Sequence, residues 1–334
     1  MNFHPPHPQK PGPRRQPQPS GSRPTSSPRP GTHASSTPKA HPDSSPQVTH
    51  WHNVTDWYDE LVGAEGSEYQ RAVILPGVLR MLEASEPSPP TVTSGPLRIL
   101  DLACGQGVMC RALAEHYRPP PRPTPGRLVR PVQILGVDAA PGLIAAAETR
   151  NQTDRLPIQY VVGDATKLTE VPALKPFLAE PGGTGGGRLD AITCILAIQN
   201  MTPLSPIWEA CAKLLKPGGR LILVMMHPCY RIPKTSGWGW DDKTRLQYRR
   251  IETYLTSSKT PIQMHPGADP TAQTVTFHRP LQAYINTLGS QGLLLDHIEE
   301  WASHKQSQPG PKQAALDQSR KEIPLFLALR ARRV

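Results

Sequence analysis

Cysteines are few in this 334-residue chain, and their pattern argues against two kinds of scaffold. They are odd in number and include no C-x-x-C pair, which speaks against a disulfide framework and against a structural zinc site. We therefore expect no bound metal, and a protein of a reducing cytoplasm. The cysteines are Cys104, Cys110, Cys194, Cys211 and Cys229.

Long apolar runs are also lacking. The chain has no apolar core of the length that a secretory signal needs. A membrane-spanning helix requires about 20 mostly apolar residues in succession, and no such stretch occurs. The sequence thus predicts a cytoplasmic protein with no membrane span.

Large apolar residues are almost missing from residues 1–48, where proline, serine and arginine dominate. Such a segment cannot offset the entropy of ordering itself, so we predict a disordered, partly polyproline-like tail. The tail and the stretch RPPPRPTPGRLVRP, residues 118–131, carry most of the net charge of +10. The rest of the chain is close to neutral, so a basic nucleic-acid-binding face is not expected.

The segment before the first expected strand has helical spacing. Ile74, Val78, Met81 and Leu82 would share one face of a helix. Pro76 should kink this helix or start a new one, because proline lacks the N–H that a helix interior uses.

Strands and helices then alternate, which favours a parallel sheet covered by helices on both faces. The last two strands are separated only by a charged loop and should pair antiparallel. We therefore predict an α/β, Rossmann-like, seven-stranded and mostly parallel sheet with an antiparallel last strand. The expected strands are 97–102, 132–137, 158–162, 189–196, 220–226, 293–300 and 323–332, and the expected helices are 107–117, 141–150 and 205–215.

Acidic residues and glycines gather where the expected strands end, which is where ligands bind in open parallel sheets. Gly105 and Gly107 let the backbone come close to a ligand. Asp138 can accept hydrogen bonds from both hydroxyls of a ribose, and Asp164 can face the exocyclic amine of an adenine. The motif GQGVMC has a cysteine where a dinucleotide loop prefers glycine. Asp101 beside the ligand suits a cation better than a phosphate.

On these motifs residues 97–334 resemble the class I S-adenosylmethionine-dependent methyltransferases. The matches, in order, are ILDLACGQG, LGVDAAPGLIAAA, VVGDATKL and LLKPGGRLILV. The resemblance implies S-adenosylmethionine as cofactor, its methionine moiety held by Asp101 and the backbone of 103–107, its ribose by Asp138 and its adenine by Asp164 with Ala165. The family most often has glycine at the position of Ala103. The cofactor-binding residues expected in this way are Asp101, Ala103, Cys104, Gly105, Gln106, Gly107, Asp138, Ala139, Asp164, Ala165 and Leu196.

The same resemblance divides the chain. After the tail, residues 49–334 would form a methyltransferase domain. Its expected parts are N-terminal helices and a linker at 49–96, a cofactor-binding core at 97–226, a lid or acceptor insertion after the fifth strand at 227–279, and a final helix and strands at 280–334.

An acceptor site should be built from parts that the common core does not need, because the protein's main contribution is to hold the acceptor in line with the methyl group. The helices before residue 85 and the insertion 227–279 qualify. The insertion concentrates aromatic residues, which offer flat apolar walls with polar edges; packing for stability is an equal alternative for each of them. The candidate substrate-binding residues are Tyr58, Tyr69, Gln199, Asn200, Tyr230, Trp238, Trp240, Tyr248 and His278.

His227 follows the fifth expected strand. Its imidazole titrates near neutral pH, so it is the candidate catalytic base if the acceptor must lose a proton. Alternatively, the ring only forms hydrogen bonds in the turn that Pro228 begins.

We expect a methyltransferase acting on a small organic acceptor, most similar to the branch that includes the ubiquinone and menaquinone biosynthesis enzymes. The sequence IQNMTP stands where an N-P-P-Y-type turn would indicate methylation of an amide or nucleobase nitrogen, so no nucleic-acid partner is expected. Two alternatives stay open: a non-catalytic cofactor-binding or scaffold protein whose tail recruits a partner, and a nucleic-acid methyltransferase. The methylated atom and the oligomeric state are open as well.

Overall fold

The computed structural model describes residues 62–63, 65–83, 95–119, 131–178, 189–263 and 273–334. All of them belong to one unit that covers residues 46–334. The expected tail and the candidate residue Tyr58 lie outside the described residues. Within the described part, no helix combines the length and apolar character needed to cross a membrane.

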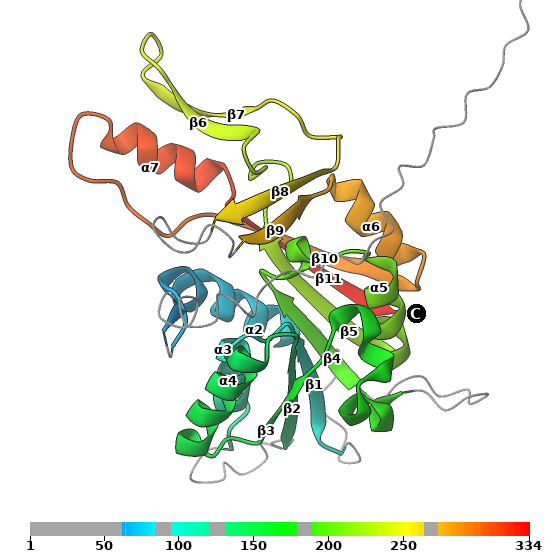
Figure 1. The fold of residues 1–334 in the computed structure, drawn as a ribbon. Coiled ribbons are helices and arrows are strands. Elements are labelled where there is room, and N and C mark those ends of the chain that lie inside the picture. The colour runs from blue at the N-terminus through cyan, green and yellow to red at the C-terminus, as the bar shows by residue number, and fades with distance from the viewer. Residues whose placement is uncertain (1–61, 64, 84–94, 120–130, 179–188, 264–272) are drawn as a thin grey trace, which may run out of the picture. The chain divides into compact units, whose positions relative to one another are not determined.

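A seven-stranded sheet with the order β10-β11-β5-β4-β1-β2-β3 forms the centre of this unit (Figure 1). Strands β1 to β5 are parallel, and β11 runs antiparallel to both of its neighbours, β5 and β10. The predicted fold class is thus confirmed. The strands are β1 Leu97–Leu102, β2 Val132–Asp138, β3 Ile158–Val162, β4 Leu189–Ile195, β5 Leu215–Met226, β10 Leu293–Trp301 and β11 Phe326–Arg333.

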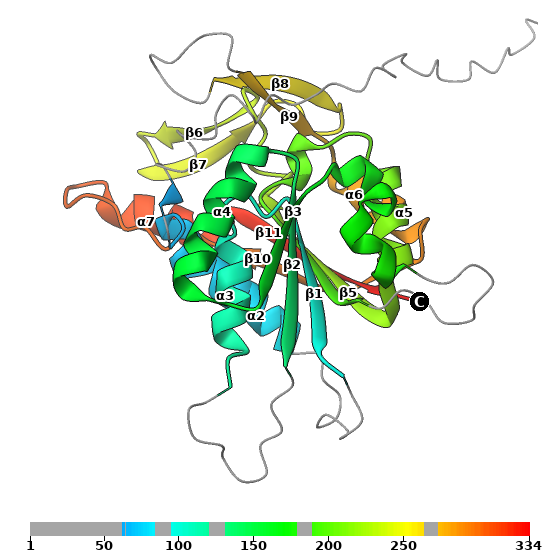
Figure 2. The same cartoon turned by 60° about the horizontal axis from the view of Figure 1, so that its bottom comes forward.

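Helices cover both faces of the sheet (Figure 2). One face packs on α2 Leu75–Glu83, α3 Val108–His116 and α4 Pro141–Asp154. The other packs on α5 Ser205–Leu214, α6 Leu281–Gly289 and the 3-10 helices η3 Ala165–Glu170 and η4 Pro172–Phe177. The central strands read as apolar runs because both of their faces are buried in this way.

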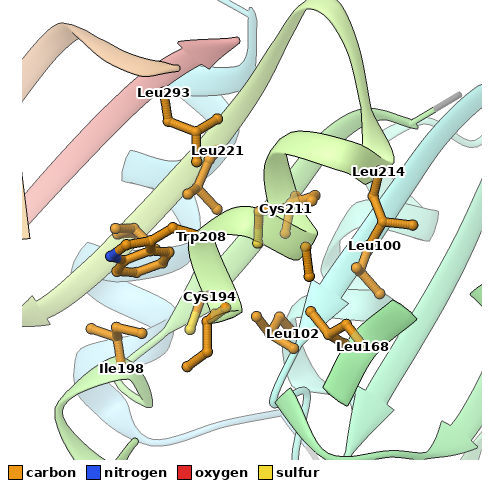
Figure 3. Packing of buried hydrophobic residues seen from close by; sticks show 14 of the residues in the cluster. Leu100, Leu102, Leu168, Cys194, Ile198, Trp208, Cys211, Leu214, Leu221 and Leu293 are labelled. Carbon is orange, nitrogen blue, oxygen red and sulfur yellow. The ribbon is translucent and has the colours of Figure 1, made fainter. Parts of the chain in front are cut away.

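Trp208 of α5 is fully buried at the centre of the second face, near Leu102 and Cys194 (Figure 3). Its indole Nε1 donates a hydrogen bond to Thr287 Oγ1 of α6 at 3.1 Å. A buried indole N–H needs such a partner, so this contact fixes α5 against α6.

The N-terminal segment starts a new helix at the expected place. The π-helix η2 Gln70–Ile74 leads directly into α2, and Pro76 occupies the first turn of α2. Proline supplies no N–H for an intrahelical bond, which fits a change from the π to the α hydrogen-bond pattern at this point.

Strand β5 and the connection between β10 and β11 differ from the sequence-based expectation. β5 begins at Leu215 instead of 220, because its pairing with β4 skips residues around Gly218, whose φ is +75°. The connection between β10 and β11 is not only a charged loop: it contains α7 Gln313–Glu322. This polar helix buries only Ser319, so it lacks the apolar face by which a helix is recognised in sequence.

The insertion between β5 and α6 contains two antiparallel hairpins that were not predicted. They pair β6 Ser236–Asp241 with β7 Leu246–Ile251, and β8 Ser258–Gln263 with β9 Gln273–His278. Both hairpins lie beyond the carboxyl ends of the parallel strands (Figures 1 and 2). The insertion is thus positioned beside the edge of the sheet where a ligand is expected.

Candidate active site

The turn between β1 and α3 has three residues in the left-handed region. The φ angles are +56° for Ala103, +55° for Gly105 and +81° for Gly107. A Cβ atom at Gly107 would lie 2.3 Å from the hydroxyl of Tyr160, so only glycine fits there. Ala103 adopts the same region at a cost of about 1–2 kcal/mol. Strain of this kind concentrates at ligand-binding turns.

Asp101, near the end of β1, is almost completely buried. Its carboxylate accepts hydrogen bonds from Thr193 Oγ1 at 2.7 Å and from Cys110 Sγ at 3.4 Å. Burial raises the pKa of Asp101 to about 7; the two hydrogen bonds oppose this shift, and the charge of Asp138 adds to it. A cation bound nearby would favour the ionised form of this carboxylate.

Asp138, the last residue of β2, connects the end of its strand to the β1–α3 turn. Its Oδ2 accepts from Gly105 N–H and its Oδ1 from Ala140 N–H, both at 2.9 Å. A carboxylate has about four acceptor sites, so Asp138 can hold the turn and also accept from ligand hydroxyls. The structure therefore brings two predicted parts of the cofactor site together.

Asp164 follows β3, the neighbour of β2 in the sheet. Its Oδ1 accepts from the backbone N–H and the hydroxyl of Thr166, both at 2.8 Å, and it caps η3, which begins at Ala165. Asp101, Asp138 and Asp164 thus stand at the ends of three adjacent strands. Ala139, next to Asp138, is exposed at the same edge.

Gln106 lies in the same turn and is fully buried. Its Nε2 donates to the carbonyl of Gly63 at 3.0 Å, whereas its Oε1 has no hydrogen-bond partner among the described residues. An unsatisfied buried acceptor is costly unless a ligand N–H completes it. With Asp101 and Asp138 it forms a set of acceptors, which fits a ligand bearing an ammonium group, a sulfonium and ribose hydroxyls.

Cys104, within the turn, is buried, and burial raises the pKa of its thiol above the ordinary value. Such a thiol is a poor nucleophile, in agreement with a packing role.

Two candidate residues after β4 have backbone roles. Leu196 has a φ of +56°, and its N–H donates to Val224 O at 2.7 Å. The Gln199 amide donates to Met226 O at 3.2 Å and accepts from Met226 N–H at 3.0 Å. Gln199 therefore closes the carboxyl end of β5, and Asn200 is the next residue, at the end of η5 Ile198–Asn200.

His227, directly after β5, uses both ring nitrogens. Its Nε2 lies 2.6 Å from Glu300 Oε1, and its Nδ1 accepts from the N–H of Cys229, in the turn that Pro228 begins. The proton is therefore on Nε2, and the lone pair of Nδ1 is occupied. Burial lowers the pKa of His227, although Glu300 opposes the shift. This geometry favours the anchoring alternative, and a base role remains a hypothesis.

Tyr69 and Tyr230 gather near the same strand end. Tyr69 donates to or accepts from Ser303 Oγ at 3.1 Å, and its ring centroid lies 5.7 Å from that of Phe326, which pairs with Met226 in the sheet. The ring centroid of Tyr230 lies 4.7 Å from that of His227. Two aromatic rings from distant segments thus border the end of β5.

The remaining candidates lie on the two hairpins of the insertion. Trp238 and Trp240 share one face of β6, and Lys312 Nζ lies 4.3 Å from the centroid of the Trp240 ring. Tyr248 lies on the opposite face, against Gly239, and is 48% exposed. His278 of β9 is buried and donates through Nε2 to the carbonyl of Tyr254 at 2.7 Å. The structure does not bring Tyr248 together with the two tryptophans.

Sequence reasoning missed two residues of this region, Arg231 and Arg249. Their guanidinium carbons lie 5.1 Å and 5.3 Å from the centroid of the Trp238 ring. Basic residues interspersed among the aromatics of the insertion were a signal that could have indicated them. Among the described residues there is no cluster of three or more His, Cys, Asp or Glu side chains that could hold a metal ion.

The sheet order with antiparallel β11, and the acidic strand ends around a left-handed turn, define a class I methyltransferase fold. Comparisons agree: residues 100–221 match a family described as a methyltransferase domain. A solved S-adenosylmethionine-dependent methyltransferase from Mesorhizobium loti is 25% identical, with a TM-score of 0.52 over 78% of this chain and all of that one.

Curated relatives match a shorter part of the chain. A ubiquinone biosynthesis O-methyltransferase of Xanthomonas oryzae pv. oryzae is 29% identical over 130 residues, which is 39% of this chain and 43% of the relative. A protein of the same name from Xylella fastidiosa is 29% identical over 126 residues, or 38% and 40%. The match thus spans less than half the length of these relatives. Residues 100–221 thus carry a methyltransferase domain, and the fold of the chain is that of the class I S-adenosylmethionine-dependent methyltransferases, whose cofactor is S-adenosylmethionine.

Proposed function

We propose that this protein transfers a methyl group from S-adenosylmethionine to a small organic acceptor. The observation that carries the proposal is the row of three carboxylates, Asp101, Asp138 and Asp164, at adjacent strand ends around the left-handed β1–α3 turn. When bound, the cofactor supplies a sulfonium methyl group that is transferred by in-line displacement.

The residues of this site would divide the work of binding. Asp101 and the unpartnered Oε1 of Gln106 would hold the cationic methionine end, Asp138 the ribose hydroxyls, and Asp164 the edge of the adenine. Because Asp138 also accepts from Gly105 N–H, ribose binding and the shape of the turn would be coupled.

The acceptor would lie against the end of β5, between Tyr69 and Tyr230. The relatives named O-methyltransferases support a small molecule with a nucleophilic oxygen. In this proposal the protein contributes chiefly by holding the acceptor in line and excluding water. His227 anchors the turn after β5.

Calorimetry with S-adenosylhomocysteine, the demethylated product of the cofactor, tests the assignment. Asp138→Ala should weaken binding by about 10- to 100-fold, because hydrogen bonds to a charged acceptor contribute about 1.5–3 kcal/mol. Asp138→Asn keeps the shape of the side chain but removes its charge. Its affinity should lie between that of the unmodified protein and that of Asp138→Ala. Asp154→Ala, an exposed carboxylate at the end of α4, is the matched control. Unchanged affinity of Asp138→Ala would contradict the assignment.

A labelled methyl group tests the acceptor class. Incubating the protein with methyl-labelled S-adenosylmethionine and a cell extract should place the label in the low-molecular-mass fraction. Label in nucleic acid would support a nucleic-acid methyltransferase instead. Binding of S-adenosylhomocysteine without any transfer would support the non-catalytic alternative.

A further inference from the structure

Two arginines of the insertion share one indole ring. Arg249 of β7 is directly opposite Trp238 of β6 in the hairpin register, and Arg231 approaches the same ring from the turn after β5. Each guanidinium lies within the range of a cation–π contact. One aromatic ring therefore keeps two positive charges close together.

Neutral acceptors hold both guanidinium groups in place. Arg231 donates through Nε to Pro324 O and through Nη2 to Ile323 O, both at 3.2 Å. Arg249 donates through Nε to Tyr230 O at 2.7 Å and through Nη2 to Ser236 Oγ at 2.9 Å. Each group has five N–H donors, so donors remain on both.

The two charges lack a counter-ion in the part of the chain that the structure describes, since no carboxylate there forms an ion pair with either guanidinium. Both side chains are half-buried. Burial, followed by the repulsion from Arg249, lowers the pKa of Arg231 to about 10. Bringing like charges together costs free energy, which an anion bound between them would offset.

The pair lies at the edge of the sheet that carries the candidate active site. Arg231 N–H donates to His227 O at 2.7 Å, immediately after β5, and its side-chain acceptors directly precede β11. The ring centroid of Tyr69 lies 5.7 Å from that of Phe326, which is two residues after the Pro324 carbonyl that accepts from Arg231. Two candidate acceptor residues, Tyr69 and Tyr230, thus adjoin the arginines.

We infer that Arg231 and Arg249, placed around Trp238, form a binding site for an anionic group of the methyl acceptor, a carboxylate or a phosphate. This inference rests on the proposed function, because it assigns a chemical class to the acceptor. Arginine suits such a site because its planar fork matches the paired oxygens of both groups. Neutral acceptors of similar shape would bind less well.

Fluorine NMR on the full chain labelled with 5-fluorotryptophan can test the site, with the Trp238 signal assigned through Trp238→Phe. The probes are benzoate, phenyl phosphate and the uncharged benzamide. We expect a saturable shift of the Trp238 signal with benzoate or phenyl phosphate and none with benzamide. The anion with the higher affinity shows whether the site favours a carboxylate or a phosphate.

Two arginine variants test whether the shift of the Trp238 signal depends on Arg249. Arg249→Gln should weaken anion binding by about 10- to 100-fold. Arg250→Gln is the matched control, because Arg250 is the next residue on the other face of β7 and pairs with Glu252 at 3.1 Å. It should leave the affinity within about twofold.

Two results would overturn the inference: benzamide shifting the Trp238 signal as strongly as benzoate, or an equal loss in the Arg249 and Arg250 variants. If Arg249→Gln does not fold, the comparison of benzoate with benzamide on the unmodified chain still shows whether the site requires an anion. Calorimetry with S-adenosylhomocysteine on the same sample separates the two proposals. Cofactor binding without an anion response overturns only the anion site, whereas absence of cofactor binding overturns the proposed function.

Discussion

Replacing Asp101 by asparagine should make the protein more stable and its cofactor binding weaker. The carboxylate of Asp101 is buried and has only Thr193 and Cys110 as hydrogen-bond donors among the described residues. Asparagine has nearly the same shape, can accept from the threonine hydroxyl through its oxygen, and carries no charge. Asp101→Asn therefore removes a charge that the unliganded fold has to bury.

The direction with pH follows from the raised pKa. Asp101 titrates at about 7 in the folded protein instead of 3.8, so the native state keeps this proton longer than the unfolded chain does. The free energy of unfolding then falls as pH rises from about 4 to about 7, and it levels off above that. At pH 8 the cost is on the order of 4 kcal/mol.

Thermal melting at two pH values measures this effect. At pH 8, Asp101→Asn should melt at least about 5 °C above the unmodified protein, because 1 kcal/mol shifts the midpoint of a domain of this size by about 2–4 °C. At pH 5 the carboxyl is protonated, so the two proteins should melt within about 2 °C of one another. Thr193→Val, which removes the donor to Asp101, should show a loss of stability that grows with pH.

Cofactor affinity gives an independent readout of the same group. If the cationic end of the cofactor lies beside Asp101, binding requires the ionised carboxylate, and affinity should rise about tenfold between pH 6 and pH 8. Asp101→Asn should flatten this rise, and the comparison also removes the titration of the ligand itself. An equal loss of melting temperature at pH 5 and pH 8 in Asp101→Asn would refute the reasoning.

Two further predictions concern anchoring and strain. His227→Ala should lower the free energy of unfolding by about 1–3 kcal/mol, because both ring nitrogens are hydrogen-bonded; a hundredfold loss of turnover with unchanged chemical denaturation would instead identify a catalytic base. Ala103→Gly should raise the melting temperature slightly, since glycine relieves up to about 1 kcal/mol of left-handed strain net of its own entropy. Ala112→Gly, inside α3, should lower the melting temperature by a similar amount, and a shift of the same sign in both variants would contradict this account.

The central strands of the sheet were predictable because they are buried on both faces. Strand β1, Leu97–Leu102, coincides with the predicted range, and β4, Leu189–Ile195, ends one residue earlier than predicted. Continuous apolar runs that end in an aspartate or a glycine identify such strands without help from distant contacts.

The hairpins of the insertion have no such signal. The strand SGWGWD carries two glycines and SKTPIQ a proline, and both residue types are depleted in strands. These strands form two separate two-stranded sheets outside the central sheet instead of lying inside its core. Their existence depends on what they pack against, and the local sequence does not contain that information.

The candidate site shows the same division. The types of its acidic residues and the turn after β1 could be predicted, because a strand end and the following turn are local features. The contacts of Gln199 and His227 could not be predicted. The side-chain amide of Gln199 pairs with the backbone of Met226, and the ring of His227 pairs with Glu300, 73 residues further along the chain. Both residues were expected near the acceptor, and the structure shows them closing the end of β5.

The part of the proposed site that would bind the cofactor and the part that would bind the acceptor depend on different contacts. In the proposed site, the three carboxylates and the β1–α3 turn lie within residues 97–165, so their geometry follows from the sheet itself. The acceptor half depends on long-range contacts such as Arg231 to Pro324 and Thr276 to Gln199. Since these contacts do not involve the β1–α3 turn, substitutions in the insertion can alter which acceptor is bound while the cofactor half keeps its shape. The arginine pair around Trp238 belongs to the proposed acceptor half, so we expect substitutions there to change acceptor specificity and to leave cofactor binding unchanged.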